Sequence, residues 1–216
     1  MRICTLKDIN KDEIAEIQAL HVKWLAQETD GQCADLHCYN LRGMDLRGTT
    51  WRSANLNCAD LRNTDLRETN LHGAHLNGAD LRGAKLNKAD LSKALLNKAT
   101  LCGVSLYGIN LNGANLYYAD LHNVNLRYAK LHDAKLRHAN LTGADLGYTS
   151  MFGADLRSVI LYHTNMAYAY LCKANLRYVN INDTCLLGAN IWMADIEGIN
   201  VNGVVLDEVG LRKLCQ

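Results

Sequence analysis

Cysteine and histidine are the residues of this sequence best suited to metal or thiol chemistry, and there are eight of each. The cysteines do not follow the spacing of zinc ligands or of a disulfide framework; they are Cys4, Cys33, Cys38, Cys58, Cys102, Cys172, Cys185 and Cys215. Cys38 and Cys58 lie twenty residues apart, as do Cys102 and His122. The first pair could form a disulfide or remain two reduced thiols. The second pair offers only two ligands, too few for a metal site. We therefore expect no cofactor and no metal.

Candidate catalytic residues are equally dispersed. An active site needs convergent groups in a sheltered cavity. Here each Asp and His occupies a repeating position with an outward side chain, and no long loop interrupts the repeat to cover a substrate. The glycines follow the same repeat and lack the context of a phosphate-binding loop. We expect that the chain is not an enzyme and has no catalytic residues.

A repeat of five residues organises most of the chain. Of the 35 positions from Leu36 to Leu206 in steps of five, 28 are Leu and the others are Trp, Met, Ile or Val. Two residues before each centre, 20 of the 35 residues are Ala and six are Thr. The block Ala79-Asp80-Leu81-Arg82-Gly83 shows the unit. A period of five fits neither an α-helix nor a regular strand, and a fixed repeat indicates a solenoid or array.

Within each unit, the order apolar, polar, apolar predicts a very short strand that directs alternate side chains inward and outward. The next two residues must turn a corner, and 13 of the 16 glycines lie two residues after a centre. Glycine suits such a tight bend because it has no Cβ. The sequence contains no proline, which suits a backbone that is hydrogen-bonded between coils nearly everywhere.

These tandem A(D/N)Lxx units resemble those of the pentapeptide-repeat proteins, over about four fifths of the chain. The resemblance implies an all-β solenoid, a right-handed quadrilateral parallel β-helix in which four pentapeptides make one coil and residues twenty apart stack. Thirty-five units would then give about nine coils. The family is functionally diverse, so the resemblance implies a non-catalytic binding or scaffold role without naming a partner.

The repeat divides the chain into three segments: an N-terminal segment at 1–32, the β-helix at 33–206 and a C-terminal segment at 207–216. In the first segment, Asn10 and Glu13 predict the start of a capping α-helix that runs to about Gln27. One side of this helix carries Ile14, Ile17, His21, Trp24 and Leu25. We expect this side to cover the open first coil, with Trp24 as the plug and Ile14, Ile17 and Leu25 as the other capping residues. Alternatively, this helix binds a partner. The last segment could cap the final coil or, as in several relatives, join two copies into a homodimer.

The charge pattern limits the classes of partner. A net charge of +1 fits neither a uniformly basic nucleic-acid binder nor a strongly acidic mimic of nucleic acid. No run of 18 apolar residues and no signal-peptide core are present, so we expect no membrane span and a cytoplasmic location. In the first coils, Arg follows and Asp precedes many centres. This alternation predicts a solvated exterior with ion pairs or, alternatively, a site for an anionic partner.

From Tyr107 onward the expected surface becomes aromatic, with nine of the ten tyrosines. Tyr128, Tyr148 and Tyr168 fall in one column of residues twenty apart, and a second column holds Arg137, Arg157 and Arg177. Tyr and Arg are typical anchors of protein interfaces, but stacked aromatic rings can also simply stabilise a solenoid. These six residues are the candidate partner-binding site.

The favoured function is a rigid scaffold or protein–protein interaction module whose partner the sequence does not identify. The alternative is a DNA-mimicking protein that protects gyrase, as in the quinolone-resistance branch of the family. That branch has a dominant acidic surface, often Phe at the centres, and inserted loops. This chain has Leu centres, a single Phe and a charge near zero. Direct nucleic-acid binding through the arginine columns is a third possibility and would be steeply salt-dependent.

Overall fold

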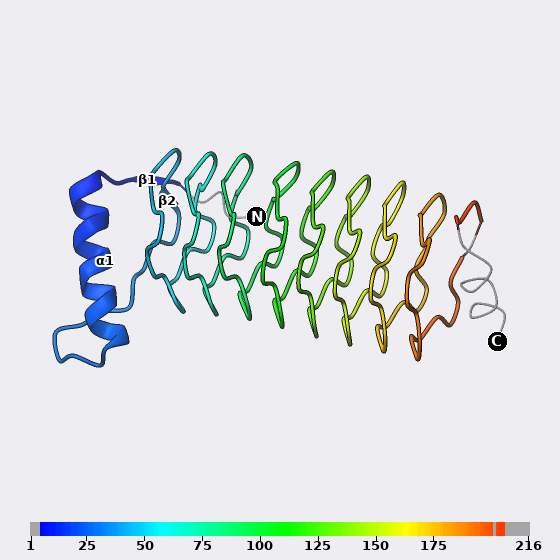
Figure 1. Cartoon of the computed structure of the whole chain (residues 1–216). Coiled ribbons are helices and arrows are strands. Elements are labelled where there is room, and N and C mark those ends of the chain that lie inside the picture. Colours follow the sequence, from blue (N-terminus) through cyan, green and yellow to red (C-terminus); the bar gives the residue numbers. More distant parts are fainter. Residues whose placement is uncertain (1–4, 201, 206–216) are drawn as a thin grey trace.

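The computed structural model describes residues 5–200 and 202–205 (Figure 1). Strand β1 (Lys7–Asp8) leads into helix α1 (Lys11–Leu25), which is followed by strand β2 (Tyr39–Asn40). β1 pairs in parallel with β2, with Lys7 opposite Tyr39. Figure 1 shows α1 lying across one end of a long stack of coils. Within the described ranges, no helix is long and apolar enough to cross a membrane.

The coils are joined by a parallel ladder whose partners are always twenty residues apart. The ladder consists of isolated bridges that run from Asp35 with Asn55 to Cys185 with Val205. On both sides of a bridge, backbone N–H groups of one coil donate to carbonyls of a neighbouring coil, as in Leu36 N to Asn55 O at 2.6 Å. The stacking at an interval of four pentapeptides, predicted from the sequence, is confirmed, and the fold is a β-helical solenoid.

The repeating Leu and Ala side chains form one continuous core along the stack. Leu61, Leu101 and Leu141 are fully buried, and so are Ala54, Ala114 and similar residues two positions before a centre. Each buried Leu contributes about 1.5–3 kcal/mol relative to an exposed one. The expectation that these residues line the interior is confirmed, and the polar positions between them project outward.

The corners explain why the third residue of each turn is so often Gly. In each corner, the residue three after a centre donates its N–H to the carbonyl of that centre, as in Ala54 N to Trp51 O at 3.1 Å. The residue two after the centre has a positive φ at every position from Cys38 to Gly203, between +54° and +71°. Type II turns require this conformation at their third residue, and it favours Gly or Asn. Many non-glycine residues nevertheless adopt it here, Tyr128 and Tyr148 among them.

The Asp or Asn before each centre has a structural role that the sequence did not reveal. Its Oδ1 accepts a hydrogen bond from the backbone N–H two residues later, as Asp60 does from Arg62 at 3.1 Å and Asn70 from His72 at 3.1 Å. This arrangement is the Asx turn, in which a short polar side chain imitates a backbone turn. Asp and Asn are therefore equivalent at this position for the backbone, although only Asp adds charge.

Buried threonines keep their hydroxyls satisfied inside the solenoid. Thr64 and Thr164 occupy the position usually held by Ala, and their Oγ1 atoms donate at 2.8 Å to the carbonyls of Leu41 and Leu141 in the preceding coils. A buried hydroxyl without such a partner would cost about 1–3 kcal/mol. The exchange of Ala for Thr is thus tolerated because a carbonyl lies within reach.

Helix α1 begins with the capping box expected from the sequence. Asn10 Oδ1 accepts from the backbone N–H groups of Asp12 and Glu13 at 2.9 Å, and the Glu13 carboxylate accepts from Asn10 N at 2.8 Å. The helix ends at Leu25, two residues before the expected end. Ile14 is buried, Ile17 packs against the core and Leu25 is half-buried.

Trp24 does not plug the solenoid as expected, because its side chain is 38% exposed. The fully buried ring on this helix is His21, which lies between Trp24 and Trp51. Trp51 replaces Leu at a centre of the first coil and is itself buried. The large ring of Trp51 fills the space beneath the helix, so Trp24 stays partly exposed at the edge of the contact between α1 and the first coil. The C-terminal segment 207–216, predicted as a cap or dimer contact, lies outside the described residues.

Candidate partner-binding surface

Three tyrosines of the candidate site form a continuous stack on the outside of the solenoid. The ring centroids of Tyr128 and Tyr148 are 5.1 Å apart, with planes 10° apart. Those of Tyr148 and Tyr168 are 4.9 Å apart, at 13°. The three side chains remain 43–50% exposed. The stack repeats at the spacing of the coils, so the rigid backbone ladder sets the distance between rings.

Arg127 contacts this stack and was not identified from the sequence. Its guanidinium lies 5.6 Å from the ring centroid of Tyr128 and 5.4 Å from that of Tyr148. It is also 3.4 Å from a carboxylate oxygen of Asp145. Cation–π contacts of this kind contribute about 0.5–1 kcal/mol at exposed sites. The sequence could have pointed to Arg127, because it directly precedes Tyr128 in the chain.

Tyr107 extends the stack at one end, and the stack ends at Gly188 at the other. Tyr107 packs on Tyr128 in a tilted arrangement, with centroids 5.3 Å apart. Beyond Tyr168, the next residue of the column is Gly188, and a Cβ there would lie 2.5 Å from the Tyr168 ring. The absence of a side chain at Gly188 lets the Tyr168 ring lie against the following coil. The surface formed by Tyr107, Arg127, Tyr128, Tyr148 and Tyr168 is called the tyrosine stack below.

The arginine column of the candidate site lies elsewhere. Arg137 is nine residues after Tyr128, close to half of the twenty-residue coil, so the two columns lie on different sides of the solenoid. Arg157 donates to Asp155 at 2.6 Å, and Arg177 contacts Asp195 at 3.4 Å and also pairs with Glu197. The structure therefore does not bring the predicted tyrosines and arginines together into one patch.

The first coils carry the predicted ion pairs, and these are formed mainly within a coil. Arg62 binds Asp60 through two hydrogen bonds of 2.8 and 2.5 Å, and Arg82 binds Asp80 in the same way. Hydrogen bonding to Arg62 lowers the pKa of Asp60. The Arg47 guanidinium likewise lowers the pKa of Asp45 to about 2. These carboxylates are neutralised by neighbouring guanidinium groups.

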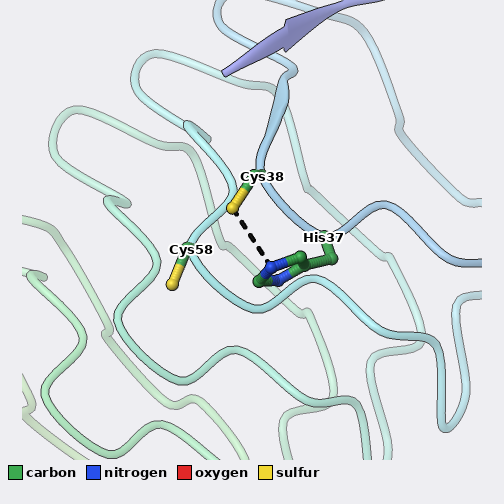
Figure 2. Close-up of side chains that lie close together, drawn as sticks. All are labelled: His37, Cys38 and Cys58. Carbon is green, nitrogen blue, oxygen red and sulfur yellow. Dashed lines mark hydrogen bonds between the residues drawn. The ribbon is translucent and has the colours of Figure 1, made fainter. Parts of the chain in front are cut away.

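Figure 2 shows a cluster of potential ligands near β2, formed by His37, Cys38 and Cys58. One ligand atom of each lies within 4.8 Å of the others, and Cys38 Sγ is 3.3 Å from His37 Nε2. The disulfide considered between Cys38 and Cys58 is not present, because Cys58 is a free thiol and Cys38 takes part in another disulfide. The sulfur of Cys38 cannot then serve as a thiolate ligand.

Comparison with known proteins agrees with the repeat read from the sequence. The family model for pentapeptide repeats matches eight copies. The matched segments are 34–73, 65–103, 94–132, 105–143, 119–157 and 154–192, which together span most of the chain. The chain belongs to the pentapeptide-repeat family. Members of this family are generally non-enzymatic scaffolds.

Solved structures of other pentapeptide-repeat proteins resemble the chain. QnrB1, a plasmid-mediated fluoroquinolone resistance protein, is 18% identical with a TM-score of 0.63, and the match covers 85% of this chain and 94% of QnrB1. HetL, from the cyanobacterium Nostoc sp. strain PCC 7120 and involved in heterocyst differentiation regulation, is 25% identical with a TM-score of 0.48; the match covers 93% of this chain and 98% of HetL. No curated protein sequence matches the chain. At these identities the likeness to QnrB1 concerns the fold.

Proposed function

We propose that this pentapeptide-repeat protein is a rigid protein–protein interaction module that binds its partner through the tyrosine stack. The observation that supports this most directly is the set of three parallel rings, each about half exposed, held about 5 Å apart by the backbone ladder. Tyr provides a large contact area with a polar hydroxyl and few rotatable bonds. Rings that are already ordered lose little conformational entropy on binding.

The architecture suits such a role. We infer a right-handed quadrilateral β-helix of about nine coils, with α1 as the cap of the first coil. The contacts of Ile14 with the core and of His21 with Ala34 support the capping role. We propose a cytoplasmic location. Arg137, Arg157 and Arg177 would contribute a separate, second contact surface.

Protection of gyrase by DNA mimicry is less well supported. A mimic of duplex DNA needs a field of uncompensated negative charge. Five aspartates each form an ion pair with an arginine: Asp45, Asp60, Asp65, Asp80 and Asp155. The negative charge of these five carboxylates is therefore compensated. The likeness to QnrB1 extends to the fold and leaves the surface chemistry open.

The proposal is tested by affinity capture from the source cell with three forms of the protein. The first is the wild type, and the second carries Tyr128→Asn, Tyr148→Asn and Tyr168→Asn. Asn is chosen because it tolerates the positive φ of these positions. The control carries Tyr118→Asn, Tyr162→Asn and Tyr178→Asn, which removes three exposed rings outside the stack.

We expect partners retained by the wild type and the control to be depleted at least about tenfold with the stack variant, as for loss of interface anchors. Matching circular dichroism spectra would establish that all three forms are folded. Equal recovery of the same partners by all three forms would refute the tyrosine stack as the binding surface. If only the control variant loses these partners, the binding surface contains Tyr118, Tyr162 or Tyr178 and not the tyrosine stack.

A further inference from the structure

A second cluster of ligand atoms lies on the solenoid, away from the tyrosine stack. Cys102, Asp120 and His122 each offer one ligand atom, and these atoms all lie within 4.8 Å of one another. We propose that these three residues bind a single divalent transition-metal ion with the preferences of zinc. The sequence suggested only Cys102 and His122, which are one coil apart. Asp120 supplies the third ligand from the neighbouring coil.

The backbone holds the three ligands in place before any metal arrives. Leu101 N donates to the carbonyl of Asp120 at 2.9 Å, and Gly103 N donates to the carbonyl of His122 at 3.0 Å. Cys102 is therefore flanked on both sides by hydrogen bonds to the coil that carries the other two ligands. Precise placement on rigid elements is what a metal site requires.

The column that contains the cluster shows why these residues are unusual. One and two coils before Cys102, the same position is occupied by Arg82 and Arg62, which bind the aspartates of their own coils. Beside Asp120 that arginine is replaced by His122, whose Nδ1 lies 2.7 Å from Asp120 Oδ1. In its own coil, Cys102 is preceded at the Asp position by a Thr. The ladder of ion pairs thus gives way to a set of metal-binding side chains.

The donor set fits zinc better than a hard cation. Zinc binds thiolate, imidazole and carboxylate ligands, and sites with three protein ligands keep a fourth position for water. The side chains of Asp120 and His122 are 39% and 40% exposed, so an ion can reach them from solvent. Arg82 is a cation close enough to act on Cys102, and its charge is already balanced by three side-chain hydrogen bonds to Asp80.

Binding of a metal requires Cys102 to act as a thiolate, because the thiolate and not the thiol is the ligand. A bound divalent ion would displace the thiol proton and offset the repulsion between the thiolate and the carboxylate of Asp120.

Cobalt(II) is a suitable probe because its bond to a thiolate absorbs in the near ultraviolet, whereas bonds to nitrogen and oxygen do not. We would titrate the full-length protein with Co²⁺ without added reductant, so that Cys38 stays in its disulfide, and then displace the cobalt with Zn²⁺. The variants are Cys102→Ser, Asp120→Asn and His122→Asn; Ser92 and Asn112 show that Ser and Asn fit the outward position after a centre. Controls are Cys58→Ser and Cys172→Ser, which remove free thiols elsewhere.

We expect a thiolate–cobalt band that saturates at about one equivalent in the wild type and both controls. Cys102→Ser should abolish the band, and Asp120→Asn or His122→Asn should weaken binding at least about tenfold. Zn²⁺ should raise the Tm of the wild type but not that of Cys102→Ser, a readout that does not depend on absorption. A wild type without the band, or a band that persists in Cys102→Ser, would overturn the proposal.

Discussion

The imidazole of His21 stacks on the indole of Trp51, with ring centroids 5.9 Å apart and planes 16° apart. This contact joins α1 to the first coil. His21 Nδ1 also accepts a hydrogen bond from Ala34 N at 3.1 Å, so Nδ1 carries no proton and the ring is neutral. Its Nε2 is buried and makes no hydrogen bond of normal geometry with the described residues, although a weaker interaction with the Arg52 backbone opposes the effect of burial on the pKa of the ring. The helix is therefore attached through a ring that cannot accept a second proton without losing the bond to Ala34.

The first prediction is that acid weakens the attachment of α1. Burial lowers the pKa of His21 below its ordinary value of 6.5. Below pH 6.5 the unfolded chain then binds more protons than the folded one, and stability falls as the pH decreases. The contribution of neutral His21 to stability is fully present above pH 6.5. Melting curves followed by tryptophan fluorescence between pH 7.5 and 5 should show a falling Tm.

His21→Asn provides the matched test, because an Asn Oδ1 can accept from Ala34 N but does not titrate. We expect the variant to lose most of the decline in Tm between pH 7.5 and 5. His75→Asn is the control, since His75 is exposed and Asn is common at its position in the repeat. A decline of equal size in all three proteins would show that His21 is not responsible.

The second prediction concerns the backbone conformation of the tyrosine stack. Tyr148 has a φ of +59° and stacks on two other rings. Removing its ring should cost about 1–3 kcal/mol, because each aromatic contact contributes about 0.5–1.5 kcal/mol. A left-handed residue with a Cβ also costs about 1–2 kcal/mol. We therefore expect Tyr148→Gly to be about 1 kcal/mol more stable than Tyr148→Ala, the reverse of the usual order in helices and strands.

Urea unfolding of the two variants and the wild type would measure this difference. Leu187→Ala and Leu187→Gly form a control pair, because Leu187 lies in the corner next to the stack but does not have a positive φ. There Ala should be at least as stable as Gly. The prediction fails if Tyr148→Ala proves the more stable of its pair.

The repeat allowed the interior, the corners and the stacking interval to be predicted, because each follows from a side-chain position within five residues. Contacts between different positions of neighbouring coils were missed. Arg127 reaches Tyr148 and Asp120 approaches Cys102 because their side chains extend diagonally between coils. Trp24 was assigned the role of His21 because hydrophobicity alone favours the indole. The choice depends on the unusual Trp51 beneath the helix, which a helical pattern cannot reveal.

The third prediction concerns the end of the tyrosine stack at Gly188. Gly188→Ala introduces a Cβ 2.5 Å from the Tyr168 ring at a φ of +65°. The substitution should cost about 1–2 kcal/mol for the backbone and about 0.5–1.5 kcal/mol more if the ring leaves Tyr148. Gly108→Ala is the control, because Gly108 occupies the same column and a Cβ added there would meet nothing within 4 Å. Urea unfolding should give Gly188→Ala a lower free energy of unfolding than Gly108→Ala. Equal losses of stability in the two variants would argue against a close contact at Tyr168.

The fourth prediction separates the two roles of the aspartates that precede the centres. Asp60 accepts from Arg62 N at 3.1 Å and also binds the Arg62 guanidinium. Asp60→Asn keeps the acceptor for the backbone, whereas Asp60→Ala removes both interactions. We expect Asp60→Ala to be about 1 kcal/mol less stable than Asp60→Asn, the usual contribution of one hydrogen bond.

Salt distinguishes the two contributions. High salt weakens the ion pair, although less than it would weaken a fully exposed pair because Asp60 is buried, and it leaves the backbone hydrogen bond unchanged. The gap between wild type and Asp60→Asn should therefore shrink in 1 M NaCl, a condition for which the screening length is about 3 Å. The gap between Asp60→Asn and Asp60→Ala should persist. If the second gap also closes in salt, the preference for Asp and Asn before each centre arises from charge and not from the turn that these side chains complete.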